Sequence, residues 1–471
     1  MQKSVAAAVA LRSAARYELG NLLARGGMGA VYRAHDKLAE REVAYKRLVV
    51  PENRSRARFV GLFQREYDTL TQLQHPSIVR AYEYGFDDQG PFYTMELLEG
   101  QGLMELAPLP PREVCRILRD VASALALLHA RRLLHRDLSP SNVRINGASR
   151  TKLIDFGALI PFGQAPDIVG TPAFMAPETL ERGRELDQRA DLYALGALAY
   201  WALTRKTPVQ ARLLDELPRA LLEPIEPPSR HVELPPALDE LVMSLLARNP
   251  LARPESAAEV MERLTTIAEL EPEPDEASVA ASYLANPKLV GRAAMLAQLE
   301  LSLPASGTSG ASFVICAEQG QGRSALLHQL TVSAQLAGAT VLRAEAPLDP
   351  VPFGLARALL RTALALYPDL LGSGEPKDSH FEQLLQPRRL TVVEAAPWSP
   401  VNASERQART LALMQKLLLS ACDRHPTAIL VDDLQRADAE SLALLAALAA
   451  EVPRHSLLLV VSVDKRVAAS D

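Results

Sequence analysis

The chain has 471 residues, 48% of them hydrophobic, and a formal net charge of −5. The length predicts two or three domains, and the apolar content is high enough for sizeable cores, which excludes global disorder. The mildly acidic charge gives no global reason to expect a nucleic acid or an anionic membrane as a partner.

The cysteines and the apolar runs favour a cytoplasmic protein without a membrane span. Cys115, Cys316 and Cys422 lie far apart, without pairing or metal-binding spacing, and are expected to be buried, reduced thiols. No run of 18 apolar residues occurs, and the short apolar segment 192–203 is expected to be a buried helix. The segment 5–11 could serve as a weak signal-peptide core, but we favour a cytoplasmic chain because the apolar run is short.

One break in composition divides the chain. The segment 269–276 is acidic and contains two prolines, which predicts an extended linker. Short strand-like runs and then long helical patterns precede it, whereas helical stretches alternate with apolar strand-like runs after it, which predicts a parallel α/β sheet. These later runs are 312–316, 340–343, 428–431 and 457–463. The expected organisation is an N-terminal extension (1–16), a first domain (17–265), a linker (266–288) and a second domain (289–471).

The first domain opens with two weak signals. Glycines 26, 27 and 29 let backbone N–H groups approach phosphate oxygens, although a plain hairpin turn has the same composition. Lys46 ends a short apolar run and can point at phosphates if an acid holds it. Glu66, in a helical pattern, is the candidate acid. Taken singly, Lys46 and Glu66 fit ordinary surface residues equally well.

A more specific signal follows in segments 134–142 and 153–157. Asp137 can accept the proton of an attacking hydroxyl group, and Asn142 and Asp155 offer the hard oxygen ligands that Mg²⁺ prefers. The sequence Gly-Thr-Pro-Ala-Phe-Met-Ala-Pro-Glu comes next, at 170–178.

Residues 17 to about 265 contain His-Arg-Asp, Asp-Phe-Gly and Ala-Pro-Glu in this order, together with Lys46 and Glu66. They therefore resemble a complete protein kinase domain of the eukaryotic-like (bacterial-type) serine/threonine class. The resemblance implies an α+β two-lobed fold, ATP in the cleft between the lobes, and Mg²⁺. It implies catalytic roles for Lys46, Glu66, Asp137, Asn142, Asp155 and Thr171, with Asn142 and Asp155 as metal ligands. It places around ATP the residues Ala24, Gly26, Gly27, Gly29, Val31, Ala44, Lys46, Met95, Glu96 and Leu98.

The resemblance also implies supporting roles in the larger lobe. Glu178 and Arg253 match the family's ion pair, and Asp191 matches the helix residue that orients the catalytic loop. Thr171 would contact Asp137 and shape the acceptor pocket, which implies serine or threonine acceptors.

Two departures from the family pattern concern charge. Ser139 stands where serine/threonine kinases have a lysine, and Ser141 stands at the alternative arginine position. Loss of one preorganised charge-stabilising group costs roughly 3–4 kcal/mol, about 10²–10³ in rate. The segment 158–170 contains no Ser, Thr or Tyr that could be phosphorylated. Asp167 could replace a phosphate near Arg136 or be simply solvated, and we favour the second reading.

The second domain contains a degraded phosphate-binding motif. The pattern G-x-x-x-x-G-K-[ST] maps onto 317–324, with Ala317 at the first glycine and Arg323 at the lysine. The apolar run 428–431 ends in Asp432 and Asp433, as in a Walker B strand. The residues expected around a nucleotide are Gly320, Gly322, Arg323, Ser324 and Asp432.

Together these features resemble the α/β P-loop ATPase domain of AAA-related, STAND-like regulatory NTPases. Because arginine is bulkier than lysine and planar, we favour a fold kept for regulation or partner contact over an active ATPase.

The expected function is ATP-dependent phosphorylation of protein Ser/Thr hydroxyls in signalling, with an appended regulatory module. The expected partners are protein substrates and a regulatory protein bound to the second domain, without nucleic acid or membrane. One alternative is a pseudokinase scaffold that binds ATP but transfers phosphate poorly, because Ser139 replaces the lysine. In another alternative, the second domain is the working ATPase switch and the kinase domain acts under its control.

Overall fold

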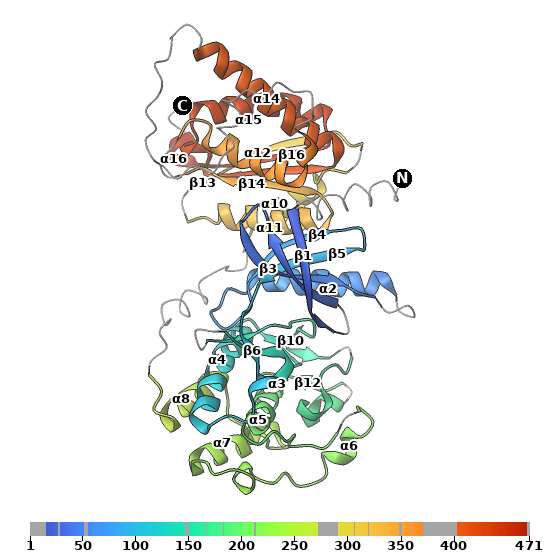
Figure 1. The fold of residues 1–471 in the computed structure, drawn as a ribbon, viewed down its shortest axis with the longest axis vertical. Coiled ribbons are helices and arrows are strands. Elements are labelled where there is room, and N and C mark those ends of the chain that lie inside the picture. The colour runs from blue at the N-terminus through green and yellow to red at the C-terminus, as the bar shows by residue number, and fades with distance from the viewer. Residues whose placement is uncertain are drawn as a thin grey trace. The chain divides into compact units, whose positions relative to one another are not determined.

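The computed structural model (Figure 1) describes residues 16–26, 29–50, 55–146, 150–165, 167–181, 183–211, 213–271, 291–305, 307–318, 320–347, 351–370 and 403–468. The chain divides into two compact units. The first lies within residues 1–51, 83–94 and 287–471, and the second within 52–82 and 95–286. The predicted extension 1–16 and linker 266–288 lie largely outside the described residues, and the predicted domain bounds stay a prediction.

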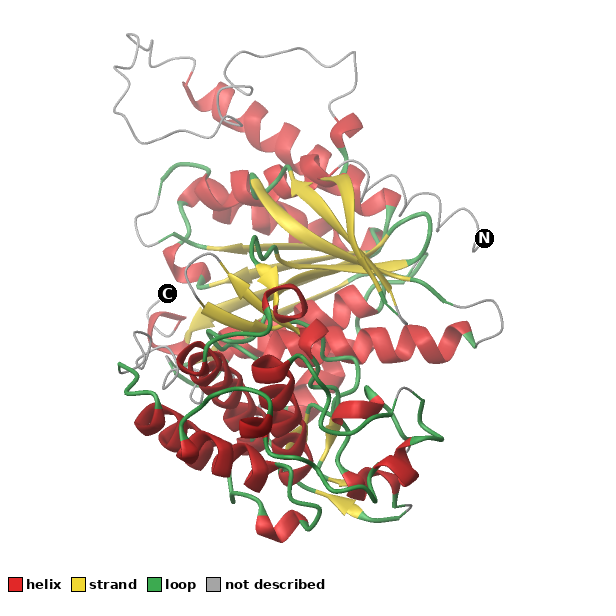
Figure 2. Ribbon diagram, turned by 60° about the horizontal axis from the view of Figure 1, so that its bottom comes forward, coloured by secondary structure: helices red, strands yellow, loops and turns green. Residues whose placement is uncertain are grey.

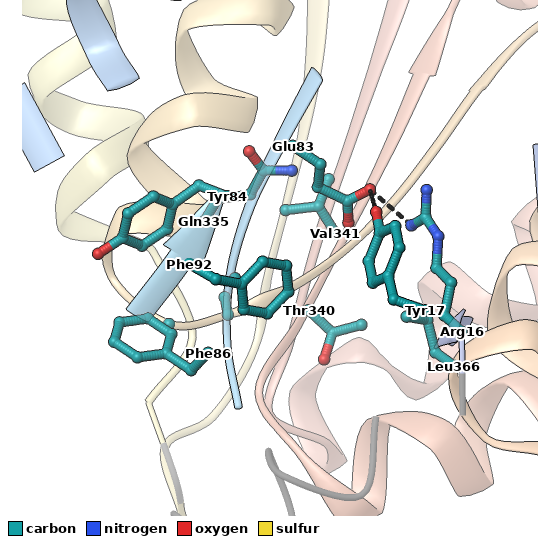
Figure 3. A pocket seen from close by; sticks show the side chains of 13 residues that line it. Arg16, Tyr17, Glu83, Tyr84, Phe86, Phe92, Gln335, Thr340, Val341 and Leu366 are labelled. Atoms are coloured by element: carbon teal, nitrogen blue, oxygen red, sulfur yellow. Dashed lines mark hydrogen bonds and ion pairs between the residues drawn. The ribbon is translucent and has the colours of Figure 1, made fainter. Parts of the chain in front are cut away.

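The first unit contains a sheet with the strand order β1-β2-β3-β5-β4. Its strands are β1 (Tyr17–Arg25), β2 (Gly29–Asp36), β3 (Arg41–Leu48), β4 (Ala81–Phe86) and β5 (Pro91–Glu96). Aromatic side chains form its core: the Tyr45 and Phe92 rings stack with centroids 4.3 Å apart, and Tyr17 meets both edge-on. Glu83 accepts a 3.3 Å hydrogen bond from the Tyr17 hydroxyl and pairs with Arg16 (Figure 3), which ties the start of β1 to β4.

The first unit also contains the parallel sheet that the sequence predicts, in the order β13-β16-β15-β14. Its strands are β13 (Ala311–Ala317), β14 (Thr340–Glu345), β15 (Thr427–Asp432) and β16 (Leu457–Asp464). The helices of this region are α10 (Ala293–Leu301), α11 (Arg323–Leu336), α12 (Gly354–Leu366), α14 (Ala403–Arg424), α15 (Ala439–Glu451) and α16 (Lys465–Ala468).

Helices cover both faces of this sheet because its strands are apolar on both sides. Along β15, Ala428 and Leu430 pack into one cluster with α10 and α11, whereas Ile429 and Val431 pack into another with α12, α14 and α15. Every residue of β15 is buried, which is the pattern of an inner parallel strand. The predicted α/β fold of this part is therefore confirmed.

Helices are the main regular secondary structure of the second unit, and Figure 2 draws the helices of the chain in red. They are α2 (Arg56–Gln72), α3 (Leu103–Leu106), α4 (Pro111–Ala130), α5 (Arg189–Thr204), α6 (Leu217–Ala220), α7 (Pro236–Leu245) and α8 (Ala257–Ile267). Helix α5 contains the segment expected to be a buried helix, and its residues from Ala190 to Leu203 are all buried. Gly196 lets α5 approach α7, because a Cβ atom there would lie 2.6 Å from the Cβ of Leu245.

Short strands connect these helices. They are β6 (Gln101–Gly102), β7 (Leu133–Leu134), β8 (Val143–Asn146), β9 (Arg150–Leu153), β10 (Ile160–Pro161), β11 (Gly163–Gln164) and β12 (Glu185–Leu186). They pair as a three-stranded sheet, β6-β8-β9, and as the pairs β10-β7 and β11-β12. Within the described part of the chain, no helix combines the length and the apolarity that a membrane span requires.

One expectation about the cysteines is wrong. Cys115 and Cys422 are buried as expected, and burial raises the pKa of their thiols to about 11 and about 12. Cys316 is exposed instead. It lies on β13, an edge strand with a neighbour on one side only, and burial alternates along this strand.

Candidate active site

A β-hairpin brings Asn142 and Asp155 to the same end of two paired strands. Asn142 immediately precedes β8 and Asp155 closely follows β9, and the register pairs Val143 with Leu153. The backbone N–H of Ile154 donates a 3.1 Å hydrogen bond to the Asn142 carbonyl oxygen, so the pairing continues to the site. The Asp155 carboxylate accepts a 3.1 Å bond from the Gly157 N–H, which orients it.

Hydrogen bonds fix both oxygens of the Asp137 carboxylate. Its Oδ1 atom accepts bonds of 3.0 Å from the Thr171 N–H and 2.9 Å from the Thr171 hydroxyl. Its Oδ2 atom accepts a 3.2 Å bond from the Asn142 side-chain amide. Three residues that the sequence predicts to act together, Asp137, Asn142 and Thr171, are therefore in direct contact.

Gly170 allows Thr171 to come this close to the loop that carries Asp137. A Cβ atom at position 170 would lie 2.7 Å from the Arg136 carbonyl oxygen, and the glycine has φ +132°, which other residues rarely adopt. A larger residue at this position would therefore separate the two segments.

Asp191, at the start of α5, holds the loop before Asp137. Its carboxylate accepts 2.9 Å bonds from the backbone N–H groups of His135 and Arg136 and lies 2.9 Å from His129 Nε2. Burial opposes its ionisation, but these hydrogen bonds and the neighbouring imidazoles hold the pKa of Asp191 below its usual value. His129 was not predicted from the sequence, since nothing in its spacing points to Asp191.

Glu178 and Arg253 form the ion pair expected from the resemblance. The guanidinium donates two bonds to the carboxylate, of 2.6 and 2.9 Å, and its carbon lies 4.9 Å from the centre of the Tyr193 ring. Both side chains are buried, so this bidentate pair fixes the segment that follows Thr171.

Ser139 is buried, and its hydroxyl lies 2.7 Å from that of Ser141. The two residues that replace the family's cation positions thus satisfy each other as a neutral pair. They bring no positive charge toward Asp137.

The strands of the first unit carry the residues predicted to surround the phosphates. Ala24 pairs with Val31 across β1 and β2, and Val31 pairs with Lys46 across β2 and β3. Gly29 packs closely on β3, because a Cβ atom there would lie 2.8 Å from the Arg47 carbonyl oxygen. The Gly26 N–H donates a 2.8 Å bond to the Gly29 carbonyl oxygen. Gly27 lies outside the described residues.

Lys46 is not an ordinary surface residue. It is buried, and its ammonium nitrogen lies 5.6 Å from the centre of the Tyr93 ring. Its neighbours Tyr45 and Arg47 both bond Asp87, at 2.9 and 2.6 Å, which holds the strand on either side of Lys46. Asp87 was not predicted from the sequence.

Glu66 is also buried, on α2 in the second unit. Because Lys46 and Glu66 belong to different units, their pairing stays a prediction.

The predicted adenine-binding segment has a partner that the sequence analysis missed. Met95 and Leu98 are buried, and Glu96 accepts a 2.7 Å bond from the Lys152 ammonium group on β9. Lys152 comes shortly before Asp155, so this ion pair connects the segment of Glu96 to the strand that leads to the metal-binding candidate.

Asn142 and Asp155 fit a Mg²⁺ ion. The Asn142 amide nitrogen donates to Asp137, which leaves the amide oxygen as its acceptor, and Asp155 offers a carboxylate. Both are hard oxygen ligands. Among the described residues, no group of three or more His, Cys, Asp or Glu side chains could hold a metal ion, at this site or at another.

The degraded motif of the second domain forms a turn before α11. Gly320 and Gly322 have φ of +84° and +81°, and Arg323 is the first residue of the helix. The buried Arg323 guanidinium donates a 3.2 Å bond to Asp433 and lies 3.7 Å from Asp464. Ser324 is exposed. Asp464, the last residue of β16, was not predicted from the sequence.

The acids of this second site are already paired. Asp433 contacts Arg323 through one oxygen and Arg436, at 3.3 Å, through the other. Asp432 accepts hydrogen bonds from the Ser462 hydroxyl and from the Asp433 N–H. Asp433 therefore does not fit a Mg²⁺ ligand in this arrangement, because two guanidinium groups occupy its carboxylate.

Comparison with known families agrees with this geometry. Residues 17–264 match the protein kinase domain family, and residues 288–461 match an AAA ATPase domain family. The first match covers more than half of the chain, so the chain belongs to the protein kinase family.

Similar proteins are bacterial kinases. The chain is 34% identical over 275 residues to serine/threonine-protein kinase PknB of Mycolicibacterium smegmatis, across 54% of this chain and 43% of the relative. It is 38% identical over 256 residues to serine/threonine-protein kinase PknD of Mycobacterium tuberculosis, across 52% and 38%. The PknB protein of Mycobacterium leprae is 33% identical over 265 residues, across 52% and 42%. The chain thus spans less than half the length of the curated relatives it matches.

Proposed function

We propose that this chain is an ATP-dependent protein kinase that phosphorylates Ser and Thr hydroxyl groups. The observation that carries the proposal is the Asp137 carboxylate, oriented by Thr171 on one oxygen and by Asn142 on the other. A carboxylate held in this way can align an acceptor hydroxyl and take its proton. The relatives named as serine/threonine-protein kinases support this acceptor class.

We assign the remaining roles from the resemblance to protein kinases. Lys46, paired with Glu66, would grip the α- and β-phosphates of ATP. The residues around the glycine-rich turn and from Met95 to Leu98 would enclose the nucleotide. Asn142 and Asp155 would hold Mg²⁺, which when bound neutralises charge on the phosphates.

The test is transfer of labelled γ-phosphate to a basic protein that contains Ser, Thr and Tyr. We expect label on serine and threonine, and none on tyrosine, because Thr171 borders the acceptor site. Label mainly on tyrosine would contradict the acceptor class. No Asp137-dependent transfer, with ATP binding retained, would favour the pseudokinase scaffold, for which the neutral Ser139–Ser141 pair is the supporting observation.

For the second domain we propose a regulatory or partner-binding role with slow or absent ATP hydrolysis. The pairing of Arg323 with Asp433 and Asp464 supports this role, because the same groups would otherwise contact phosphates and a metal ion. Phosphate release can be measured in the full chain carrying Asp137→Asn, which silences the kinase. Turnover that disappears on adding Asp433→Asn would show an active ATPase and contradict the proposal.

We further propose that the kinase works in the cytoplasm on protein substrates, with a regulatory protein as partner of the second domain. The widely spaced cysteines, none of which forms a disulfide among the described residues, support a reducing compartment.

A further inference from the structure

The carboxylate of Asp167 lies between two arginines that are far from it in sequence. Arg136, beside the catalytic Asp137, has Nη1 3.6 Å from Asp167 Oδ1 and also donates a hydrogen bond from Nη2 to the Asp167 backbone carbonyl. Arg58, on α2, has Nη2 3.4 Å from the other carboxylate oxygen. The Asp167 side chain is 42% exposed, as a solvated residue would be, but its carboxylate also contacts both arginines, so it is not simply solvated.

Arg136 needs a nearby anion because its side chain is only 5% exposed. Burial lowers the pKa of its guanidinium, and the Asp167 carboxylate opposes that shift more than Asp191 does. Asp191 already accepts three hydrogen bonds from the loop around Arg136 and from His129. Asp167 is thus the main carboxylate that neutralises Arg136.

The segment around Asp167 is held on both sides. Before it, β10 pairs with β7 and β11 pairs with β12, and Leu134, Ile160 and Leu186 form a buried cluster. After it, Gly170 packs on the Arg136 carbonyl oxygen and Thr171 bonds Asp137. Asp167 therefore adds a charged contact between these two packed parts of the segment.

We infer that Asp167 is a built-in anion that positions this segment for catalysis, so that the kinase is active without phosphorylation of the segment. The inference rests on the proposed kinase function and names its regulation. Residues 158–170 contain no hydroxyl that could carry a phosphate. A carboxylate carries less charge than a phosphate, which has about −1.5 to −2 at pH 7. The Asp167 carboxylate nevertheless contacts both the buried Arg136 and Arg58 on α2.

The test compares the full chain after phosphatase treatment, checked by mass, with the untreated chain. The variants are Asp167→Asn, Asp167→Glu and Arg58→Gln, and Glu181→Gln serves as a matched control, because it breaks an exposed ion pair with Arg184 outside the site. The readouts are kcat, the Kd for ATP, and the rate of protease cleavage within residues 158–170.

We expect the phosphatase-treated wild type to keep its full kcat. Asp167→Asn should lower kcat about tenfold, the effect of losing one charge-assisted contact, with the Kd for ATP unchanged and faster cleavage of the segment. Asp167→Glu should restore most of the loss, Arg58→Gln should have a smaller effect because Arg58 is exposed, and Glu181→Gln should match the wild type.

Two results would overturn the inference: a phosphatase-treated wild type that is inactive, or an Asp167→Asn variant with wild-type kcat and cleavage rate. If the wild type transfers no phosphate at all, the proposed kinase function fails. In that case the cleavage rate still decides whether Asp167 orders the segment.

Discussion

Thr171 donates two hydrogen bonds to one oxygen of Asp137, one from its backbone N–H and one from its hydroxyl. The backbone bond depends on Gly170, and the hydroxyl bond depends on the side chain alone. Substitution of the Thr171 side chain can therefore remove the hydroxyl bond to Asp137 while the backbone bond remains.

Thr171→Ala is expected to lower kcat by about 10- to 100-fold, since a hydrogen bond to a charged group is worth about 1.5–3 kcal/mol. Thr171→Ser keeps the hydroxyl and should stay within a few-fold of the wild type. Steady-state kinetics with a Ser-containing acceptor measures both variants. Equal kcat values for Thr171→Ala and the wild type would show that the hydroxyl does not orient Asp137.

Ser139→Lys is expected to raise kcat by up to about 10²-fold, because it restores a positive charge near the transferring phosphate. Ser139 is buried against Ser141, so size alone could disturb the loop. Ser139→Met controls for size without charge and should not raise the rate. If Ser139→Lys folds, binds ATP and leaves kcat unchanged, the charge is supplied by another group.

Arg323→Ala is expected to destabilise the parallel-sheet domain by about 2 kcal/mol, because it leaves Asp433 and Asp464 partly buried without this cation. Arg454→Ala, which breaks an ion pair whose arginine is 75% exposed, is the matched control and should have little effect. Urea unfolding of the full chain compares the two. Equal stabilities would mean that the Arg323 ion pairs contribute nothing to folding.

His75 is expected to make the stability of the protein depend on pH. Burial, and to a smaller extent the charge of Lys152, lowers the pKa of this imidazole to about 4 from an ordinary value of 6.5. Below pH 6.5 the unfolded chain therefore binds a proton that the folded chain does not. The free energy of unfolding should fall by at most about 3 kcal/mol as the pH drops from 6.5 to about 4.

The variant His75→Asn tests this dependence. Asparagine offers an oxygen near the position of Nδ1, which accepts a 3.0 Å bond from the Ser77 N–H. Urea unfolding at about pH 7 and about pH 5 should show a smaller pH-dependent loss in the variant than in the wild type. An identical loss in both proteins would assign the pH dependence to other groups.

The sequence predicted the parts of the site that follow from residue order along one segment. The residue pairs between strands β8 and β9 bring Asn142 and Asp155 to the same end of the hairpin. The motif at 170–178 brings Thr171 to Asp137. The four strands of the parallel sheet were also predictable, because each is a short apolar run between helical patterns.

The parts that sequence reasoning missed depend on contacts between segments far apart in the chain. His129 reaches Asp191, Lys152 reaches Glu96, and Asp464 lies near Arg323, but no spacing rule connects the members of these pairs. Asp167 was misjudged for the same reason. A charged residue in a loop is usually solvated, and only the fold brings Arg58 and Arg136 beside it.

The most direct test of the central claim compares the wild type with Asp137→Asn in transfer of labelled γ-phosphate to a Ser/Thr acceptor. Asparagine keeps the size of the side chain but cannot take the acceptor proton, so we predict wild-type transfer and a loss of at least about 10²-fold in the variant, with ATP binding unchanged. Equal transfer rates for the two proteins in clean preparations would contradict the assignment of this chain as a protein kinase that uses Asp137.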